Sequence, residues 1–418
     1  MRNKIYAKNT EYIACSQNLS KNLHFHKTFV YLGVCNHSQR DVLNAVLKVF
    51  YALITLEVFI KLASYFSIKN LIFSTLFINY EDGFIRRGFF GTILFWFSKI
   101  TNINPFYFQI GLTIIILLAL IVWIIRSFLN QKLNFYIFIS SFMLANVLAY
   151  NMFFFVEVYM ILLTIIMFTF LKQIEKPIYK ILFANVILIL GSLVHEAFLV
   201  FNVIPVLYFL KEENQSFLNI KKMISLVPSI LIFLLLGLYF NGQFTDENII
   251  INSWKIFTPS FIQEISPLYW TFNTTDEVLM WRIPIFKNNP INMIGFFINL
   301  LMIFFSFSWY VKKCFTEKWI SIKFLIVFQY LAIICISLIA IDYVRWFWWG
   351  NITLLISFII LQKYREKSTI LIPKTKGIEL NKLLVLFIGL PLGGSWSVTQ
   401  FFYTMPIKHV YDLITRLI

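Results

Sequence analysis

Residues 106–126 read "FYFQIGLTIIILLALIVWIIR", a mainly apolar run that ends in a single arginine. A transmembrane helix needs about 20 mainly apolar residues, so this stretch is long enough to cross a bilayer. The whole chain has the same character, because 59% of its 418 residues are hydrophobic, 13% are charged and the mean hydropathy is +0.76. Soluble domains carry about 25% charged residues. The sequence therefore predicts an all-α fold, a polytopic integral membrane helical bundle.

Similar runs recur along the chain and set the expected number of spans. We expect about 11 transmembrane helices, within a range of about 10–13, and two further short helices at 69–79 and 88–98. Residues 1–43 are polar and are predicted to form a cytoplasmic extension, and 44–418 a single transmembrane domain. The runs lie at 44–66, 106–126, 134–150, 157–171, 181–194, 197–210, 223–240, 291–311, 322–341, 347–362 and 382–400.

Basic residues gather in five loops that are separated by pairs of spans, which places all five on one face. By the positive-inside rule that face is the cytoplasm. The net charge of +16 then reflects membrane orientation, and we expect no nucleic-acid partner. The clusters are Arg126 with Lys132; Lys172, Lys176 and Lys180; Lys211, Lys221 and Lys222; Lys312, Lys313, Lys318 and Lys323; and Lys363, Arg365, Lys367, Lys374, Lys376 and Lys382.

The stretch 181–210 offers few residues for two spans. We interpret it as a hairpin of short helices with "VHEAF" between them; one tilted helix is the alternative, and would invert every later loop. His195 and Glu196 then lie at the outer end of the hairpin. Either side chain could act as a general base. The alternative for His195 is a helix-end residue hydrogen-bonded to a neighbouring carbonyl.

The first outer loop, "YEDGFIRRGFFG" at 80–91, carries four charges. Guanidinium groups match phosphate oxygens in two-point contacts, so Arg86 and Arg87 predict a site for phosphate or diphosphate. In a helical turn Asp82 would hold Arg86 at i, i+4, with Glu81 as a second nearby acid. The alternative is an Asp–Arg pair that anchors the loop.

Other candidates lie on the same predicted face. "DYVRWFWW" places Asp342 and Arg345 three residues apart, either as part of a diphosphate site or as a local salt bridge above an interfacial tryptophan belt. Glu157, near the outer end of its span, is a further substrate-binding candidate, because charges at membrane depth default to functional sites.

The long extracytoplasmic loop predicted at 241–290 is rich in aromatic residues. Sugar rings could stack on Trp254, Tyr269, Trp270 and Trp281; alternatively the segment is an amphipathic cap on the bilayer. No metal-ligand spacing is present, and no nucleotide-binding motif occurs, so we expect no metal, no cofactor and a lipid-linked donor.

Three of these motifs, "DGFIRRGFFG", "HEAF" and "DYVRW", resemble bacterial O-antigen and capsular polysaccharide polymerase-like membrane proteins. The resemblance implies a glycosyltransferase that joins undecaprenyl-diphosphate-linked repeat units at the extracytoplasmic face of the cytoplasmic (inner) membrane. It also implies chain-length regulator and flippase proteins as partners. By this resemblance Arg86, Arg87 and Arg345 hold the diphosphate, and His195 or Glu196 activates the acceptor hydroxyl. The 241–290 stretch departs from the family in carrying few cations.

Two alternatives remain open. The first is a multi-span glycosyltransferase with a lipid-phosphate-sugar donor, in which Glu81 and Asp82 would act as the catalytic base. In this case alone we expect a divalent metal, bound by the same acids. A transporter or flippase for lipid-linked sugars would instead need charges lining a pathway in mid-span.

Overall fold

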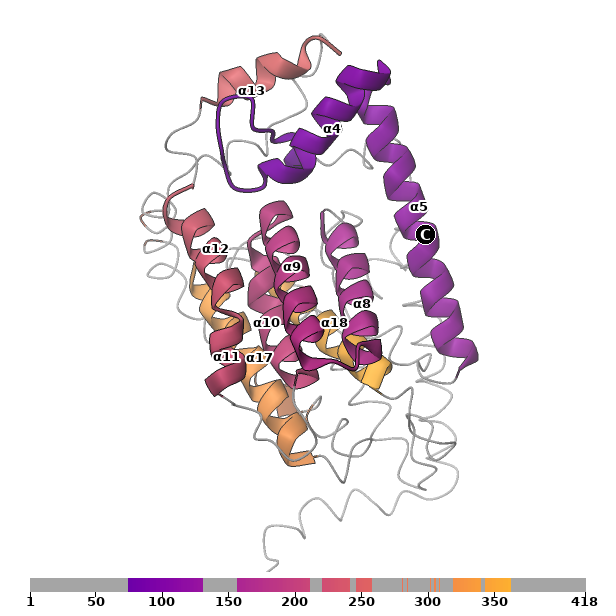
Figure 1. The fold of residues 1–418 in the computed structure, drawn as a ribbon, viewed down its shortest axis with the longest axis vertical. Coiled ribbons are helices and arrows are strands. Elements are labelled where there is room, and N and C mark those ends of the chain that lie inside the picture. Colours follow the sequence, from indigo (N-terminus) through magenta and orange to yellow (C-terminus); the bar gives the residue numbers. More distant parts are fainter. Residues whose placement is uncertain are drawn as a thin grey trace, which may run out of the picture. The chain divides into compact units, whose positions relative to one another are not determined.

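The structure, a computed structural model, describes residues 74–130, 156–210, 220–240, 246–257, 319–339 and 343–361, with a few isolated residues between 280 and 308. The chain divides into Met1–Ala52 and Leu53–Ile418, and all described residues belong to the second unit. Within them the regular elements are helices and no strand occurs, which confirms the all-α prediction for this part of the chain (Figure 1).

Most of the helices coincide with the predicted runs. Other predicted segments lie outside the described residues: the extension 1–43, the runs at 44–66, 134–150 and 382–400, and most of the run at 291–311. The elements are η3 (Ser74–Phe77), α4 (Gly88–Thr101), α5 (Pro105–Leu129), α8 (Glu157–Gln173), α9 (Pro177–Val194), α10 (Ala197–Phe209), α11 (Ile220–Ser225), α12 (Val227–Leu238), α13 (Glu247–Trp254), α17 (Trp319–Ile339) and α18 (Tyr343–Leu361).

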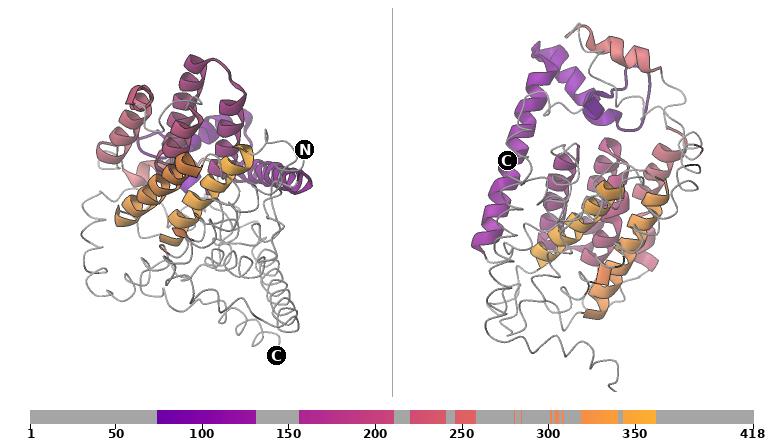
Figure 2. Two further views of the ribbon diagram at one scale, coloured as in Figure 1. Left: turned by 90° about the horizontal axis from the view of Figure 1, so that it is seen from below. Right: turned by 180° about the vertical axis from the view of Figure 1, so that it is seen from behind.

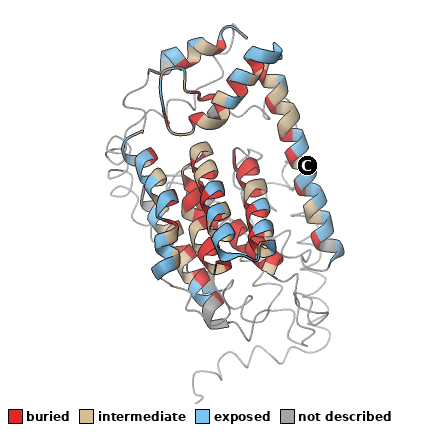
Figure 3. Cartoon of the chain, in the orientation of Figure 1, coloured by how far each residue is buried: buried red, intermediate tan, exposed pale blue. Residues whose placement is uncertain are grey.

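Two of these helices are long and apolar enough to cross a membrane. They are α5, over Pro105–Ser127 with a mean hydropathy of 2.8, and α9, over Pro177–Val194 with a mean hydropathy of 1.9. Figure 3 shows only a few buried residues along α5, between exposed and intermediate ones, whereas most residues of α10 are buried. An apolar helix that exposes its side chains is stable in lipid rather than in water.

The helices α8, α9, α10, α17 and α18 pack together, with α10 in contact with the other four. Figure 2 shows α17 and α18 from two further sides. Polar side chains link these helices in pairs: Tyr330 with Asn351 at 2.9 Å between α17 and α18, and Thr164 with Asn202 at 3.1 Å between α8 and α10. Such interhelical hydrogen bonds are typical of helix packing in membranes, where apolar contact with a neighbour gains little over contact with lipid.

The hairpin predicted over 181–210 is confirmed. Helix α9 ends at Val194, His195 is extended with φ −159° and ψ 119°, and α10 begins at Ala197. The His195 N–H still donates to the carbonyl of Gly191, and the Phe198 N–H donates to the carbonyl of His195. These bonds satisfy one backbone carbonyl near the end of α9 and one N–H at the start of α10, and leave a two-residue connection.

The run predicted at 223–240 is broken into two helices. Helix α11 ends at Ser225 and α12 begins at Val227, with Pro228 in its first turn. A proline is favoured in the first turn of a helix and disrupts the turn before it, which explains the break. Of the helix predicted at 69–79, the structure describes the 3₁₀ turn η3.

The turn η3, helix α4 and helix α13 form an apolar cluster that we call the cap. Phe95 and Phe77 each meet Trp254 edge-on, at centroid distances of 5.3 and 5.2 Å. The Trp254 indole N–H donates to the Phe77 carbonyl at 2.7 Å. Trp254 is therefore a core residue of the cap, and its predicted role as an exposed sugar-stacking residue is wrong.

Candidate functional site

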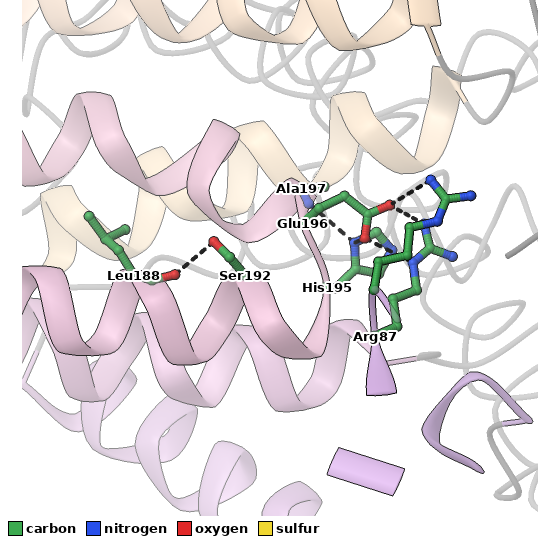
Figure 4. Close-up of polar contacts among 7 residues, drawn as sticks. Arg87, Leu188, Ser192, His195, Glu196 and Ala197 are labelled. Atoms are coloured by element: carbon green, nitrogen blue, oxygen red, sulfur yellow. Dashed lines mark hydrogen bonds and ion pairs between the residues drawn. The ribbon is translucent and has the colours of Figure 1, made fainter. Parts of the chain in front are cut away.

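Two charged motifs separated by 109 residues of sequence meet in the structure (Figure 4). The Arg87 guanidinium binds the Glu196 carboxylate at two points: Nε donates to Oε2 at 2.9 Å, and Nη2 donates to Oε1. Arg86 Nη1 lies 3.9 Å from the same Oε1. Among the described residues, two guanidinium groups thus face the Glu196 carboxylate.

The first loop reaches this position through turns rather than a helix. Gly83 has φ +106°, a conformation that is costly for residues with a side chain and that interrupts a helix. Arg87 precedes α4 with φ 65°, in the left-handed region, and the Arg86 N–H donates to the carbonyl of Phe240 at 2.9 Å. These turns aim both arginines at the end of the α9–α10 hairpin.

The predicted i, i+4 pair of Asp82 with Arg86 is therefore wrong, because the helical turn that it requires does not form. The Asp82 carboxylate instead accepts the backbone N–H of Asp246, the residue before α13. Asp82 thus ties the first loop to the start of the cap helix, while Glu81 beside it is exposed. Among the described residues, the carboxylate that faces both arginines is that of Glu196.

His195 is buried, with 2% of its surface exposed, against tryptophans of α18. Its ring meets Trp349 and Trp346 edge-on at centroid distances of 5.5 and 5.8 Å. Nδ1 accepts the Ala197 N–H at 3.3 Å, which assigns the proton of the neutral ring to Nε2, and the same atom lies 3.6 Å from Glu196 Oε2. This bond is to a backbone N–H; the predicted alternative, a bond from His195 to a neighbouring carbonyl, stays a prediction.

The charges of the site shift two pKa values. Burial by itself raises the pKa of Glu196, but Arg87, His195 and Arg86 together hold it well below its usual range. Burial lowers the pKa of Arg86 to about 10, with Glu196 opposing and Arg87 adding to the change. Both groups are charged at neutral pH. A carboxylate of low pKa is a weak base, so Glu196 is better suited to orienting Arg87 than to removing a proton.

The lowered pKa of Glu196 predicts a specific loss of stability in acid. Since the folded-state pKa lies below the value of about 4.3 for an unperturbed glutamate, Glu196 stabilises the fold above that pH, and the contribution is lost as the pH falls through the folded-state pKa. We expect the difference in melting temperature between wild type and Glu196→Gln to shrink from about pH 6 to about pH 3.5 in detergent. A constant difference across this range would contradict the assignment.

The structure describes some of the remaining candidate residues and leaves others outside its described part. Glu157 begins α8 with a fully buried side chain, and the Tyr159 ring, two residues further on, lies 5.2 Å from the Phe90 ring of α4. Arg345 lies in the first turn of α18, but its side chain is outside the described part. Asp342, Trp270 and Trp281 also lie outside the described residues.

The tryptophans Trp346 and Trp349 were missed as part of the site. The sequence favoured an interfacial belt, but both are buried against His195 and Phe201. Their spacing of three residues, which places them on one helical face, is the signal that could have indicated a shared contact.

Within the described ranges no three His, Cys, Asp or Glu side chains lie close enough together to hold a metal ion. Comparison of the chain with protein-family models, with curated proteins and with solved structures finds no match.

Proposed function

We propose that this chain is a multi-pass membrane glycosyltransferase of the surface-polysaccharide polymerase type, which joins undecaprenyl-diphosphate-linked repeat units at the extracytoplasmic face of the bacterial cytoplasmic membrane. The observation that carries the proposal is the meeting of Arg86 and Arg87 with the His195–Glu196 connection at the ends of apolar helices. Separate outer-loop motifs with phosphate-binding and acid–base chemistry come together at one place.

Each residue has a role in such a transfer. The oxygen of the acceptor hydroxyl bonds to the anomeric carbon, the bond from that carbon to the donor phosphate oxygen breaks, and the diphosphate leaves with the electron pair. Arg86 and Arg87 bind the charge that develops on this leaving group. They lie directly before the N-terminus of α4, where the helix dipole also favours an anion.

The proton of the acceptor hydroxyl needs a base other than Glu196, whose carboxylate is held by Arg87. His195 is the first candidate: its Nδ1 accepts the Ala197 N–H at 3.3 Å and would exchange that bond for the acceptor hydroxyl. Its burial against Trp346 and Trp349 fixes the ring, which favours proton transfer in a defined direction.

A second candidate function is favoured by the exposure of Glu81. In a glycosyltransferase with a lipid-phosphate-sugar donor, Glu81 and Asp82 would supply the base, with a divalent metal bound by the same acids. Glu81 is exposed, whereas the Glu196 side chain is only 17% exposed, so the Glu81 carboxylate is the more accessible of the two.

The proposal is tested by complementation in a strain that lacks this gene, reading surface-polysaccharide length on a gel at matched membrane abundance. The deletion should leave single capped repeat units, and wild type should restore the ladder. Arg86→Gln should reduce long chains by about tenfold or more, because a neutral amide cannot replace a charge-assisted contact to phosphate. Lys176→Gln, an exposed basic residue at the start of α9, is the matched control and should restore the ladder fully.

The outcomes separate the candidates. A normal ladder with Arg86→Gln would overturn the diphosphate role of this arginine. Loss of activity in Glu81→Gln and Asp82→Asn, together with a requirement for a divalent ion, would favour the second candidate. Loss of the lipid-linked precursor itself would indicate a transferase that acts earlier in assembly.

A further inference from the structure

Helix α4 is mainly apolar, and its contacts with the described part of the protein leave one side exposed. Ile93, Trp96 and Ile100 form an opposite stripe that is 49%, 51% and 78% exposed. Lys99 is the one charged residue of the helix, beside this stripe. The buried side consists of Gly88, Gly91, Leu94, Phe95 and Ser98.

The length of α4 limits what can cover this stripe. Fourteen residues of helix are about 21 Å long, which is too short for a hydrocarbon core of about 30 Å. An exposed stripe of large apolar side chains is not stable facing water and marks an interaction surface. If α4 lies along the plane of the bilayer surface, the helix does not need to span the membrane and its apolar stripe is still covered by lipid.

Helix α4 is joined closely to α5, which also exposes apolar residues. Three residues, Asn102–Asn104, join α4 to α5, and the two helices pack against each other (Figure 1). Helix α5 is one of the two candidate spans and exposes Ile115, Leu118 and Val122, so a bilayer around α5 also reaches α4.

The residues around this junction are of the types that anchor at a membrane surface. The Lys99 ammonium lies 4.9 Å from the centroid of the Trp96 ring, and Tyr107 in the first turns of α5 is 73% exposed. Tryptophan and tyrosine are enriched at the depth of lipid headgroups, and lysine extends its charge from there toward water.

We propose that α4 lies in the boundary between headgroups and acyl chains, with Ile93, Trp96 and Ile100 in lipid. Its N-terminus then holds Arg86 and Arg87 at the depth of the lipid phosphates. This inference stands on exposure and helix length and does not depend on the proposed function.

Spin labels on single cysteines test the placement in proteoliposomes, in a background with the four native cysteines replaced by alanine. Labels at Ile93, Trp96 and Ile100 are compared with two controls, Leu118 in α5 and Glu81 in the exposed turn. The readout is the ratio of collision rates with oxygen, which concentrates in lipid, to those with a water-soluble nickel complex. We expect this ratio at the α4 positions to exceed that at Glu81 by about threefold or more.

A ratio equal to that at Glu81 would place the stripe in water and overturn the inference. Low collision rates with both reagents would mean that protein, such as a second copy or a partner, covers the stripe, and would overturn it as well. The collision rates do not depend on enzymatic activity. If the polysaccharide gel contradicts the proposed function, the spin-label result for α4 is therefore unaffected. Purified labelled protein with an unchanged melting temperature establishes that each variant is folded.

Discussion

Replacing Gly91 with alanine is expected to push α4 away from the backbone of residues 76–78, against which it packs, and to destabilise the protein by about 3 kcal/mol. A Cβ atom at Gly91 would collide with the Ile78 carbonyl group, 2.6 Å from its carbon, and would lie 2.9 Å from the Leu76 carbonyl oxygen. These are backbone atoms, which cannot rotate away as a flexible side chain can. The helix must therefore shift, and Arg86 and Arg87 at its N-terminus must shift with it.

The matched control is Gly111→Ala in α5, where an added Cβ meets no atom within 4 Å. We expect Gly91→Ala to lower the melting temperature in detergent by about 5 °C or more and Gly111→Ala to change it by about 1 °C or less. Limited proteolysis should also show faster cleavage within residues 80–104 in Gly91→Ala. Equal melting temperatures and equal cleavage in the two variants would contradict the close approach of α4 to Ile78.

The positions of the helices could be predicted from the sequence because hydrophobicity alone determines where an apolar run becomes helical. The runs at 106–126 and 157–171 correspond closely to α5 and α8. The break at Leu226 was missed because an apolar run counts Pro228 as one residue among many, whereas its ring interferes with the preceding helical turn.

The contacts of the site could be predicted only in part. The sequence placed Arg86, Arg87, His195 and Glu196 on one face, but the partner of Arg87 lies 109 residues away and depends on how the cap packs. The local pairing of Asp82 with Arg86 failed because the backbone at Gly83 is not helical.

Aromatic residues were the least predictable group. Tryptophan is found both in cores and at membrane surfaces, since it has a large apolar ring and one polar N–H group. Trp254 satisfies that N–H with the Phe77 carbonyl and becomes a core residue. Only the packing of the cap, which involves residues far apart in the sequence, decides between the two environments.

The Arg87–Glu196 contact predicts an asymmetric response to neutral substitutions. Glu196→Gln leaves the Arg87 guanidinium facing an amide, whereas Arg87→Gln leaves Glu196 with Arg86 3.9 Å away. Arg87 and Glu196 are only 16% and 17% exposed, so unpaired charge here is costly. We expect losses in the free energy of unfolding of about 2–3 kcal/mol for Glu196→Gln and about 1 kcal/mol for Arg87→Gln, reduced from fully buried values because water still reaches the pair.

The double variant Arg87→Gln/Glu196→Gln completes the cycle and isolates the coupling between the two residues. The backbone at position 87 is left-handed, and glutamine, like arginine, carries a Cβ there. The backbone strain is therefore the same in every variant. We expect a coupling of about 1 kcal/mol or more from denaturant unfolding at pH 7, and Glu196→Gln to be the less stable single variant. A larger loss for Arg87→Gln would mean that Arg86 does not share the carboxylate. If the single variants keep this order of stability but Arg87→Gln has the shorter polysaccharide ladder, then Arg87 acts on the substrate and Glu196 acts through Arg87.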